Sequence, residues 1–94
     1  MTVLFSPEAE LDLATTLEHL AERNTDAAEA LRLDVFRQLS LLDEGAVDGA
    51  LTTLRSGRRV RRWLVYPLWV YYRRQGSVLE VVRVYHHARR PLER

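Results

Sequence analysis

The chain has 94 residues, carries a formal net charge of +1 and contains no cysteine. A chain this short buries only about 60–68% of its unfolded surface, so we expect one small domain over residues 1–94. The lack of cysteine excludes disulfides and thiolate metal sites. No apolar stretch approaches the roughly 20 residues that cross a bilayer, and no signal-peptide pattern begins the chain. We therefore expect a cytoplasmic protein with no membrane partner.

The charge is divided along the chain. Residues 1–50 contain eleven Asp or Glu and three Arg, a net charge of −8, whereas residues 51–94 contain eleven Arg and two Glu, a net charge of +9. All fourteen basic residues are Arg, whose planar guanidinium matches phosphate and carboxylate groups. The C-terminal half is therefore the expected docking surface for a polyanion or an acidic partner.

The N-terminal segment predicts a short strand followed by a helix. Thr2 to Phe5 reads "TVLF", a β-rich run, and "SPEAE" follows it. Ser6 is a suitable helix N-cap and Pro7 fits the first helical position. Apolar residues then recur at spacings of three and four, which predicts an amphipathic helix to about Arg23. The core positions expected on it are Leu13, Leu17 and Leu20.

A second helix follows after a connection of only about two residues, which predicts an antiparallel helical hairpin. Asn24 is expected to close the first helix, Thr25 to cap the second and Gly45 to end it. The second apolar stripe consists of Ala28, Leu31, Val35, Leu39 and Leu42.

The C-terminal half predicts irregular chain and then three strands. Residues 45–57 contain three glycines and no clear period, so we expect a loop there. Three runs rich in Val, Tyr and Trp follow, at residues 58–65, 68–74 and 78–87. Their short connections predict consecutive antiparallel hairpins. The expected fold is α+β, with the order β-α-α-β-β-β and the helical hairpin packed on one face of an antiparallel sheet.

The sequence resembles toxins of the RelE/ParE superfamily from type II toxin-antitoxin systems over nearly its whole length. The resemblance rests on the opening strand, on "SPEAELDL" at the start of the hairpin, and on "RRWLVYPLWVYYRRQGSVLEVVRVYHHARRP". It is nearest to the ParE branch, where the last strand commonly ends in "HGAR". Here Arg83 to Arg89 read "RVYHHAR". His87 stands where many ParE-like chains have glycine, and Arg90 where aspartate is common.

The resemblance implies a toxin that a cognate antitoxin holds inactive through an acidic or amphipathic C-terminal segment. ParE-like members act on DNA gyrase, and this is the first expectation for the chain. RelE-like members cut messenger RNA on the ribosome and often use lysines, which this chain lacks. The alternatives are thus an mRNA endoribonuclease toxin and a non-toxic nucleic-acid-binding relative. Whether the protein is an enzyme depends on which of these applies.

A ribonuclease would need a general base, a general acid and cations near the phosphorane. His86 or His87 is the candidate base or acid, with Tyr85 as a weaker acid. Arg83 is the nearest cation, and Arg62, Arg73 and Arg89 are further candidates. The three histidines have no metal-ligand spacing, so we expect no metal and no cofactor.

The arginines are more numerous than solubility requires and predict a surface that binds the target or a nucleic acid. Aromatic residues lie between them and can stack on bases, although most of the rings are expected in the core. The expected binding residues are Arg58, Arg59, Arg61, Arg62, Arg73, Arg89 and Arg90.

Overall fold

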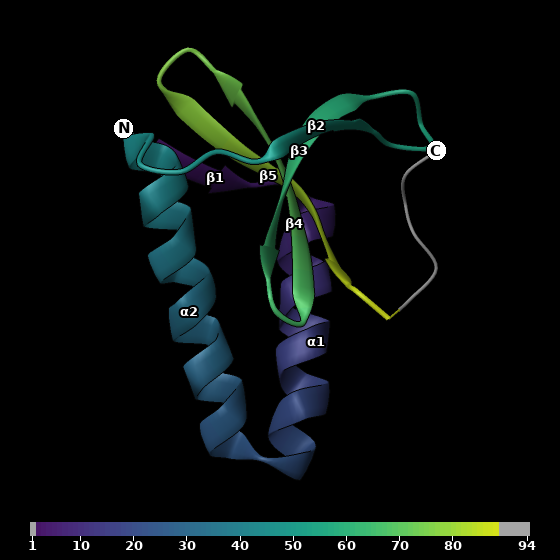
Figure 1. Cartoon of the computed structure of the whole chain (residues 1–94). Helices are drawn as coiled ribbons and strands as arrows, with labels where there is room; N and C mark the ends of the chain where they lie inside the picture. The colour runs from purple at the N-terminus through teal and green to yellow at the C-terminus, as the bar shows by residue number, and fades with distance from the viewer. Residues whose placement is uncertain (1, 89–94) are drawn as a thin grey trace.

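The computed structural model describes residues 2–88, which form two helices and a five-stranded sheet (Figure 1). In chain order the elements are β1 (Thr2–Phe5), α1 (Pro7–Arg23), α2 (Thr25–Glu44), β2 (Ala50–Thr53), β3 (Arg59–Val65), β4 (Leu68–Gln75) and β5 (Val78–His86). The strands lie side by side in the order β1-β5-β4-β3-β2. The expected α+β fold, with a helical hairpin against one face of a sheet, is confirmed.

Two details of the predicted sheet were wrong. β1 pairs with β5 in the parallel direction, so the sheet is mixed and not antiparallel throughout. The hairpin turns of the other strands do not constrain β1, because two helices separate it from them. The predicted loop also contains β2, which pairs with β3 from Ala50–Arg62 to Thr53–Arg59. A strand of four residues is too short to show a period in the sequence.

The helix ends follow from capping groups. The hydroxyl of Ser6 accepts a hydrogen bond from the Ala9 amide at 3.0 Å and donates one to the Val82 carbonyl at 2.7 Å, which attaches the start of α1 to β5. Asn24 alone joins the helices, and its side chain caps α2 by accepting from the Ala27 amide at 3.0 Å. The prediction of Thr25 as the cap was wrong by one residue. Gly45 ends α2 at a φ of +78°, as predicted.

The main core lies between the helical hairpin and one face of the sheet. The predicted helical positions Leu13, Leu31, Val35, Leu39 and Leu42 are buried there against Val65, Leu68, Val70, Tyr72, Leu79, Val81 and Val84. Leu17 and Leu20 are only partly buried. The hairpin extends past the end of the sheet at its loop end (Figure 1), so the sheet covers less of this part of the helices.

The opposite face of the sheet carries a second, smaller cluster of Leu54, Val60, Tyr71 and Val82, with Trp69 and Tyr85 packed against it. A bulge in β5 makes this possible. Tyr71 pairs with Arg83 and Tyr72 with Val81, which leaves Val82 as the extra residue. As a result Val84 faces the helices although Val82, two residues earlier, faces away from them.

Neither helix among the described residues is long and apolar enough to cross a membrane.

Candidate functional site

The two hairpins of the sheet separate at one end. Pairing between β3 and β4 stops at Arg61 and Tyr72, after which β3 continues only with β2, and β4 only with β5. Figure 1 shows the two hairpins pointing apart beyond this point. The space between them is a cavity of about 370 Å³, here called the cationic cleft. It is lined by Asp48, Leu51, Arg59, Val60, Arg61, Arg73 and Arg74.

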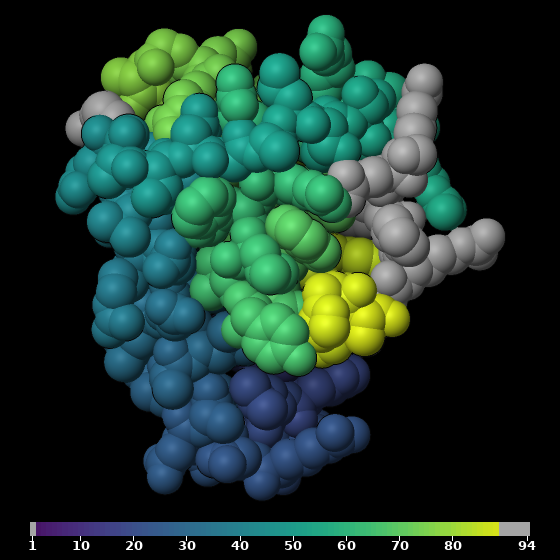
Figure 2. All heavy atoms as spheres, in the orientation of Figure 1, coloured from purple at the N-terminus to yellow at the C-terminus, as the bar shows by residue number. Residues whose placement is uncertain are grey.

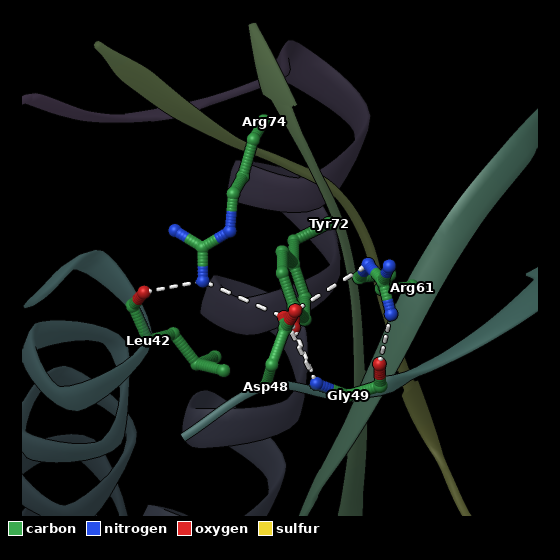
Figure 3. A network of polar contacts seen from close by, with 6 residues as sticks. All are labelled: Leu42, Asp48, Gly49, Arg61, Tyr72 and Arg74. Atoms are coloured by element: carbon green, nitrogen blue, oxygen red, sulfur yellow. Dashed lines mark hydrogen bonds and ion pairs between the residues drawn. The ribbon is translucent and has the colours of Figure 1, made fainter. Parts of the chain in front are cut away.

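A buried tyrosine and an aspartate lie at the base of the cationic cleft (Figure 3). The hydroxyl of Tyr72 donates a hydrogen bond to the Asp48 carboxylate and accepts one from the Gly49 amide at 2.6 Å. Burial, followed by the bond to Asp48, raises the pKa of Tyr72 to about 12. The same bond, with help from nearby arginines, lowers the pKa of Asp48. At neutral pH the tyrosine hydroxyl is therefore protonated and the aspartate is ionised.

Two arginines complete this network from either side. Arg61 donates to the Gly49 carbonyl at 2.7 Å, and its Nε lies 3.6 Å from the Asp48 carboxylate. Arg74 donates to the Leu42 carbonyl at 2.6 Å and lies 3.5 Å from Asp48. Leu42 is close to the C-terminal end of α2, where free carbonyls favour a cation. The arginines thus fasten the α2–β2 connection to the sheet.

Glycine is required at position 49 by the close approach of two backbone segments. A Cβ built there would lie 2.0 Å from the Arg62 carbonyl oxygen and 3.1 Å from the Tyr72 hydroxyl. A backbone carbonyl in a paired strand cannot move aside as a flexible side chain can. Any larger residue would therefore displace β2 from β3 and open the network.

The cleft keeps a positive charge after these contacts are counted. Its lining contains four arginines and one carboxylate. Arg73 donates to Glu80 at 2.6 Å but keeps 40% of its side chain exposed. Arg59 is exposed and, within residues 2–88, makes no side-chain hydrogen bond or ion pair. This arrangement can bind carboxylate or phosphate groups through charge-assisted hydrogen bonds.

The arginines predicted from the sequence do not all meet in this cleft. Arg58 is exposed just before β3. Arg62 points to the opposite face, where its guanidinium lies 4.4 Å from the centre of the Trp69 ring. Alternation along β3 therefore divides the run from Arg58 to Arg62 between two faces. Arg89 and Arg90 lie outside the described residues.

Two charged residues of the cleft lining were missed, Arg74 and Asp48. Arg74 follows Arg73 directly, and its contacts with Asp48 and the Leu42 carbonyl come from the helix side of the sheet. Because neighbouring residues of a strand face opposite sides of the sheet, the pair Arg73–Arg74 predicts an arginine on each face. Asp48 lies in the stretch expected to be a loop, and no local pattern pairs it with Tyr72, which is 24 residues away.

The residues proposed for RNA cleavage are dispersed. Arg83 is held by Asp12 of α1 through bonds of 2.7 and 3.1 Å. Tyr85 packs in the small cluster on the outer face, whereas His86 lines a cavity on the helix side. His86 and His87 stack with their ring centres 5.0 Å apart. The two histidines lie near the β3–β4 turn, at the end of the sheet opposite the cationic cleft.

The comparisons with known proteins agree on one family. The model of the ParE toxin of the parDE type II toxin-antitoxin system matches residues 3–91. A solved structure described as the chromosomal ParDE TA system from P. aeruginosa has a TM-score of 0.71, with 18% identity over 92% of this chain and 95% of that one. No curated protein sequence matches. The family match includes the hairpin and the whole sheet, so the chain belongs to the ParE toxin family of type II toxin-antitoxin systems.

Proposed function

We propose that the chain inhibits DNA gyrase by binding to it, and that a cognate antitoxin neutralises it by placing an acidic segment in the cationic cleft. The observation that carries the proposal is the cleft itself, where four arginines surround a single carboxylate. Asp48 is already occupied by Tyr72 and Arg61. An acidic partner would meet the exposed Arg59 and the accessible part of Arg73, with little repulsion from Asp48.

Inhibition by binding is favoured over RNA cleavage by the position of the candidate catalytic groups. Acid-base catalysis needs its groups within about 2.6–3.2 Å of the atoms that exchange protons. Arg83 is committed to Asp12, and Tyr85 and His86 face opposite sides of the sheet. A single RNA phosphate cannot meet all three without rearrangement. The cationic cleft needs no such rearrangement to bind an anion.

The helical hairpin offers the antitoxin a second, apolar contact. A groove of about 490 Å³ runs along it, with Phe5, Leu13, Leu17 and Phe36 among its lining residues. Leu11 and Leu33 lie on the same two helices and are 68% and 49% exposed. Contact with this groove would be little affected by salt, whereas binding in the cleft would weaken as salt screens the charges. The complex is therefore expected to survive high salt in part.

The target is tested with purified gyrase and with induced cells. The wild-type chain is expected to block supercoiling and to produce no discrete cuts in cellular messages by primer extension. Replacing both His86 and His87 by Gln should leave this activity intact. If the chain were a nuclease, loss of an acid-base group would typically cost 10²–10⁴-fold. Message cuts that vanish in the histidine variant, with supercoiling unaffected, would overturn the proposal.

The cleft is tested with a charge-matched pair of variants. Arg59→Ala combined with Arg73→Ala should weaken binding to the co-expressed antitoxin, most clearly at low salt. Arg55→Ala combined with Arg58→Ala is the control, because both arginines are exposed and lie outside the cleft lining. Equal affinity of the cleft variant and the control would remove the cleft from the antitoxin interface.

A further inference from the structure

A second concave region lies at the other end of the sheet, between α1 and the β3–β4 turn. It is a cavity of about 240 Å³ to which α1 contributes Thr16, His19 and Arg23. These residues are three and four positions apart and so lie on one side of the helix. His86 reaches the cavity from β5, and its remaining lining is Leu20, Leu31 and Pro67. A neighbouring cavity of about 180 Å³ shares Thr16, His19 and His86.

The polar groups of this cavity are hydrogen-bond donors suited to an anion. Within residues 2–88, neither Arg23 nor His19 forms an ion pair or a side-chain hydrogen bond. Nδ1 of His86 accepts from the Ala88 amide at 3.1 Å, so in the neutral ring Nε2 carries the proton and can donate it. Thr16 adds a hydroxyl group. A guanidinium, two imidazoles and a hydroxyl are donors that phosphate oxygens accept.

One carboxylate beside these donors is already paired with an arginine. Asp12 lines the neighbouring cavity. It accepts two hydrogen bonds from Arg83 and a third from the Val84 amide at 3.1 Å. The charge of Asp12 is therefore balanced within the fold.

Three aromatic rings continue outward from this cavity and are here called the ring ladder: Tyr66, His87 and His86. Tyr66 and His87 have ring centres 4.8 Å apart, and His87 and His86 have centres 5.0 Å apart. The His87 amide donates to the Pro67 carbonyl at 2.8 Å, which joins the ladder to the β3–β4 turn. Figure 2 shows the yellow end of β5 against the green turn, directly above α1.

Tyr66 leaves room for one more ring on the ladder. It is 70% exposed, although the other tyrosines of the sheet are buried or half-buried. An exposed aromatic ring that is packed against a second, tilted ring is a good platform for a nucleobase. His86 belongs both to the ladder and to the cavity, so a base on Tyr66 and a phosphate in the cavity would be parts of one site.

We propose that this end of the molecule binds a nucleotide, with the phosphate among Arg23, His19 and His86 and the base on Tyr66. The volume supports the division. Pockets that enclose a whole drug-sized ligand measure about 300–1,000 Å³, and this cavity is smaller. It therefore has room for the phosphate and part of the sugar, while the base stays outside on the ring ladder. The proposal does not depend on the target being gyrase.

Binding is tested by calorimetry on the full chain with thymidine 5′-monophosphate, inorganic phosphate and thymidine. The monophosphate is expected to bind more tightly than either half of it alone. Tyr66→Ala should lower the affinity for the monophosphate by about tenfold, which is within the range for one stacked base. The affinity of this variant for inorganic phosphate should be unchanged. Arg23→Ala with His19→Ala should weaken both. Arg55→Ala, at an exposed position elsewhere, is the control.

Three outcomes would overturn the proposal. The first is a monophosphate that binds no more tightly than inorganic phosphate. The second is wild-type affinity in the Tyr66 variant, and the third is wild-type affinity in the Arg23 and His19 variant. All the altered side chains are exposed, so circular dichroism is expected to show folded proteins.

A second titration identifies the source of the nucleotide. A short oligothymidylate with a 5′-phosphate is compared with the same strand lacking it. Tighter binding of the phosphorylated strand assigns the site to a DNA end, and binding of the mononucleotide alone assigns it to a free nucleotide. Because these titrations contain no gyrase, their failure would leave the gyrase proposal standing, and the supercoiling assay can fail without affecting them.

Discussion

The two ends of the sheet contain the same kinds of residue and use them in opposite ways. At the end with the cationic cleft, Tyr72 is completely buried and Arg61 and Arg74 are bound to backbone carbonyls. At the end with the ring ladder, Tyr66 is 70% exposed and Arg23 is exposed at the mouth of a cavity. Tyr72, Arg61 and Arg74 hold the fold together at the first end, whereas Tyr66 and Arg23 are available to a ligand at the second.

The difference follows from the backbone. At the ladder end, pairing is continuous through Val65–Leu68 and Leu68–His86, so main-chain hydrogen bonds order the strands. At the cleft end, β3 and β4 have separated, and the α2–β2 connection must be fastened by side chains instead. Side chains that replace missing backbone bonds cannot be changed without loss of stability. Side chains on a fully paired backbone are free to serve binding.

The largest expected effect is at Gly49. Gly49→Val forces a side chain against the Arg62 carbonyl, 2.0 Å from the position of a Cβ, and should lower the free energy of unfolding by about 3 kcal/mol. Gly45→Ala is the control, because its position is open but has a φ of +78°, and it should cost about 1 kcal/mol. Urea denaturation measures both. Equal losses of unfolding free energy in the two variants would mean that the close approach of the backbone at Gly49 adds no steric cost.

Tyr72→Phe is expected to cause the next largest loss of stability. It removes the hydroxyl that accepts from Gly49 and donates to Asp48, and a hydrogen bond to a charged group contributes about 1.5–3 kcal/mol. The matched change at the other end is Tyr66→Phe, which should stay within about 0.5 kcal/mol of the parent. Urea midpoints of the two variants compare the ends directly. A Tyr66 loss as large as that at Tyr72 would break the distinction between them.

The pH dependence of stability is a smaller test of the same network. The pKa of Tyr72 is raised from 10.0 to about 12 in the folded state. Its contribution is therefore complete below pH 10.0 and is lost as the pH rises from there towards 12, since the unfolded chain ionises first. Melting curves from pH 8 to 11 should fall more steeply for the parent than for Tyr72→Phe. Parallel curves would contradict the buried hydroxyl network.

Removal of the exposed side chains of Tyr66 and Arg23, at the ladder end of the sheet, should have the smallest effect on stability. Tyr66→Ala and Arg23→Ala are each expected to change the free energy of unfolding by no more than about 0.5 kcal/mol, as for ordinary surface positions. Thermal denaturation of the purified variants measures this. A loss above 2 kcal/mol at either position would show that the ladder end also depends on side chains for its order.

The sequence was sufficient for most of the fold because the signals involved are local. Ser6, Pro7 and Gly45 mark helix ends through bonds to residues a few positions away. The apolar stripes of the helices repeat every three or four residues, and most of their members lie in the core, although Leu17 and Leu20 are only partly buried. The error at Thr25 is a shift of one position, since Asn24 is an equally good cap and precedes it.

The candidate sites were decided by tertiary structure. The arginine run from Arg58 to Arg62 was visible in the sequence, but alternation and the separation of two hairpins determined that Arg59 and Arg61 line the cleft while Arg62 faces Trp69. Tyr66 and Tyr72 are the same residue type, and only the tertiary structure exposes Tyr66 and buries Tyr72. Local bonding and periodicity are encoded within a few residues, whereas the meeting of Asp48 with Tyr72, or of His19 with His86, depends on how distant elements pack.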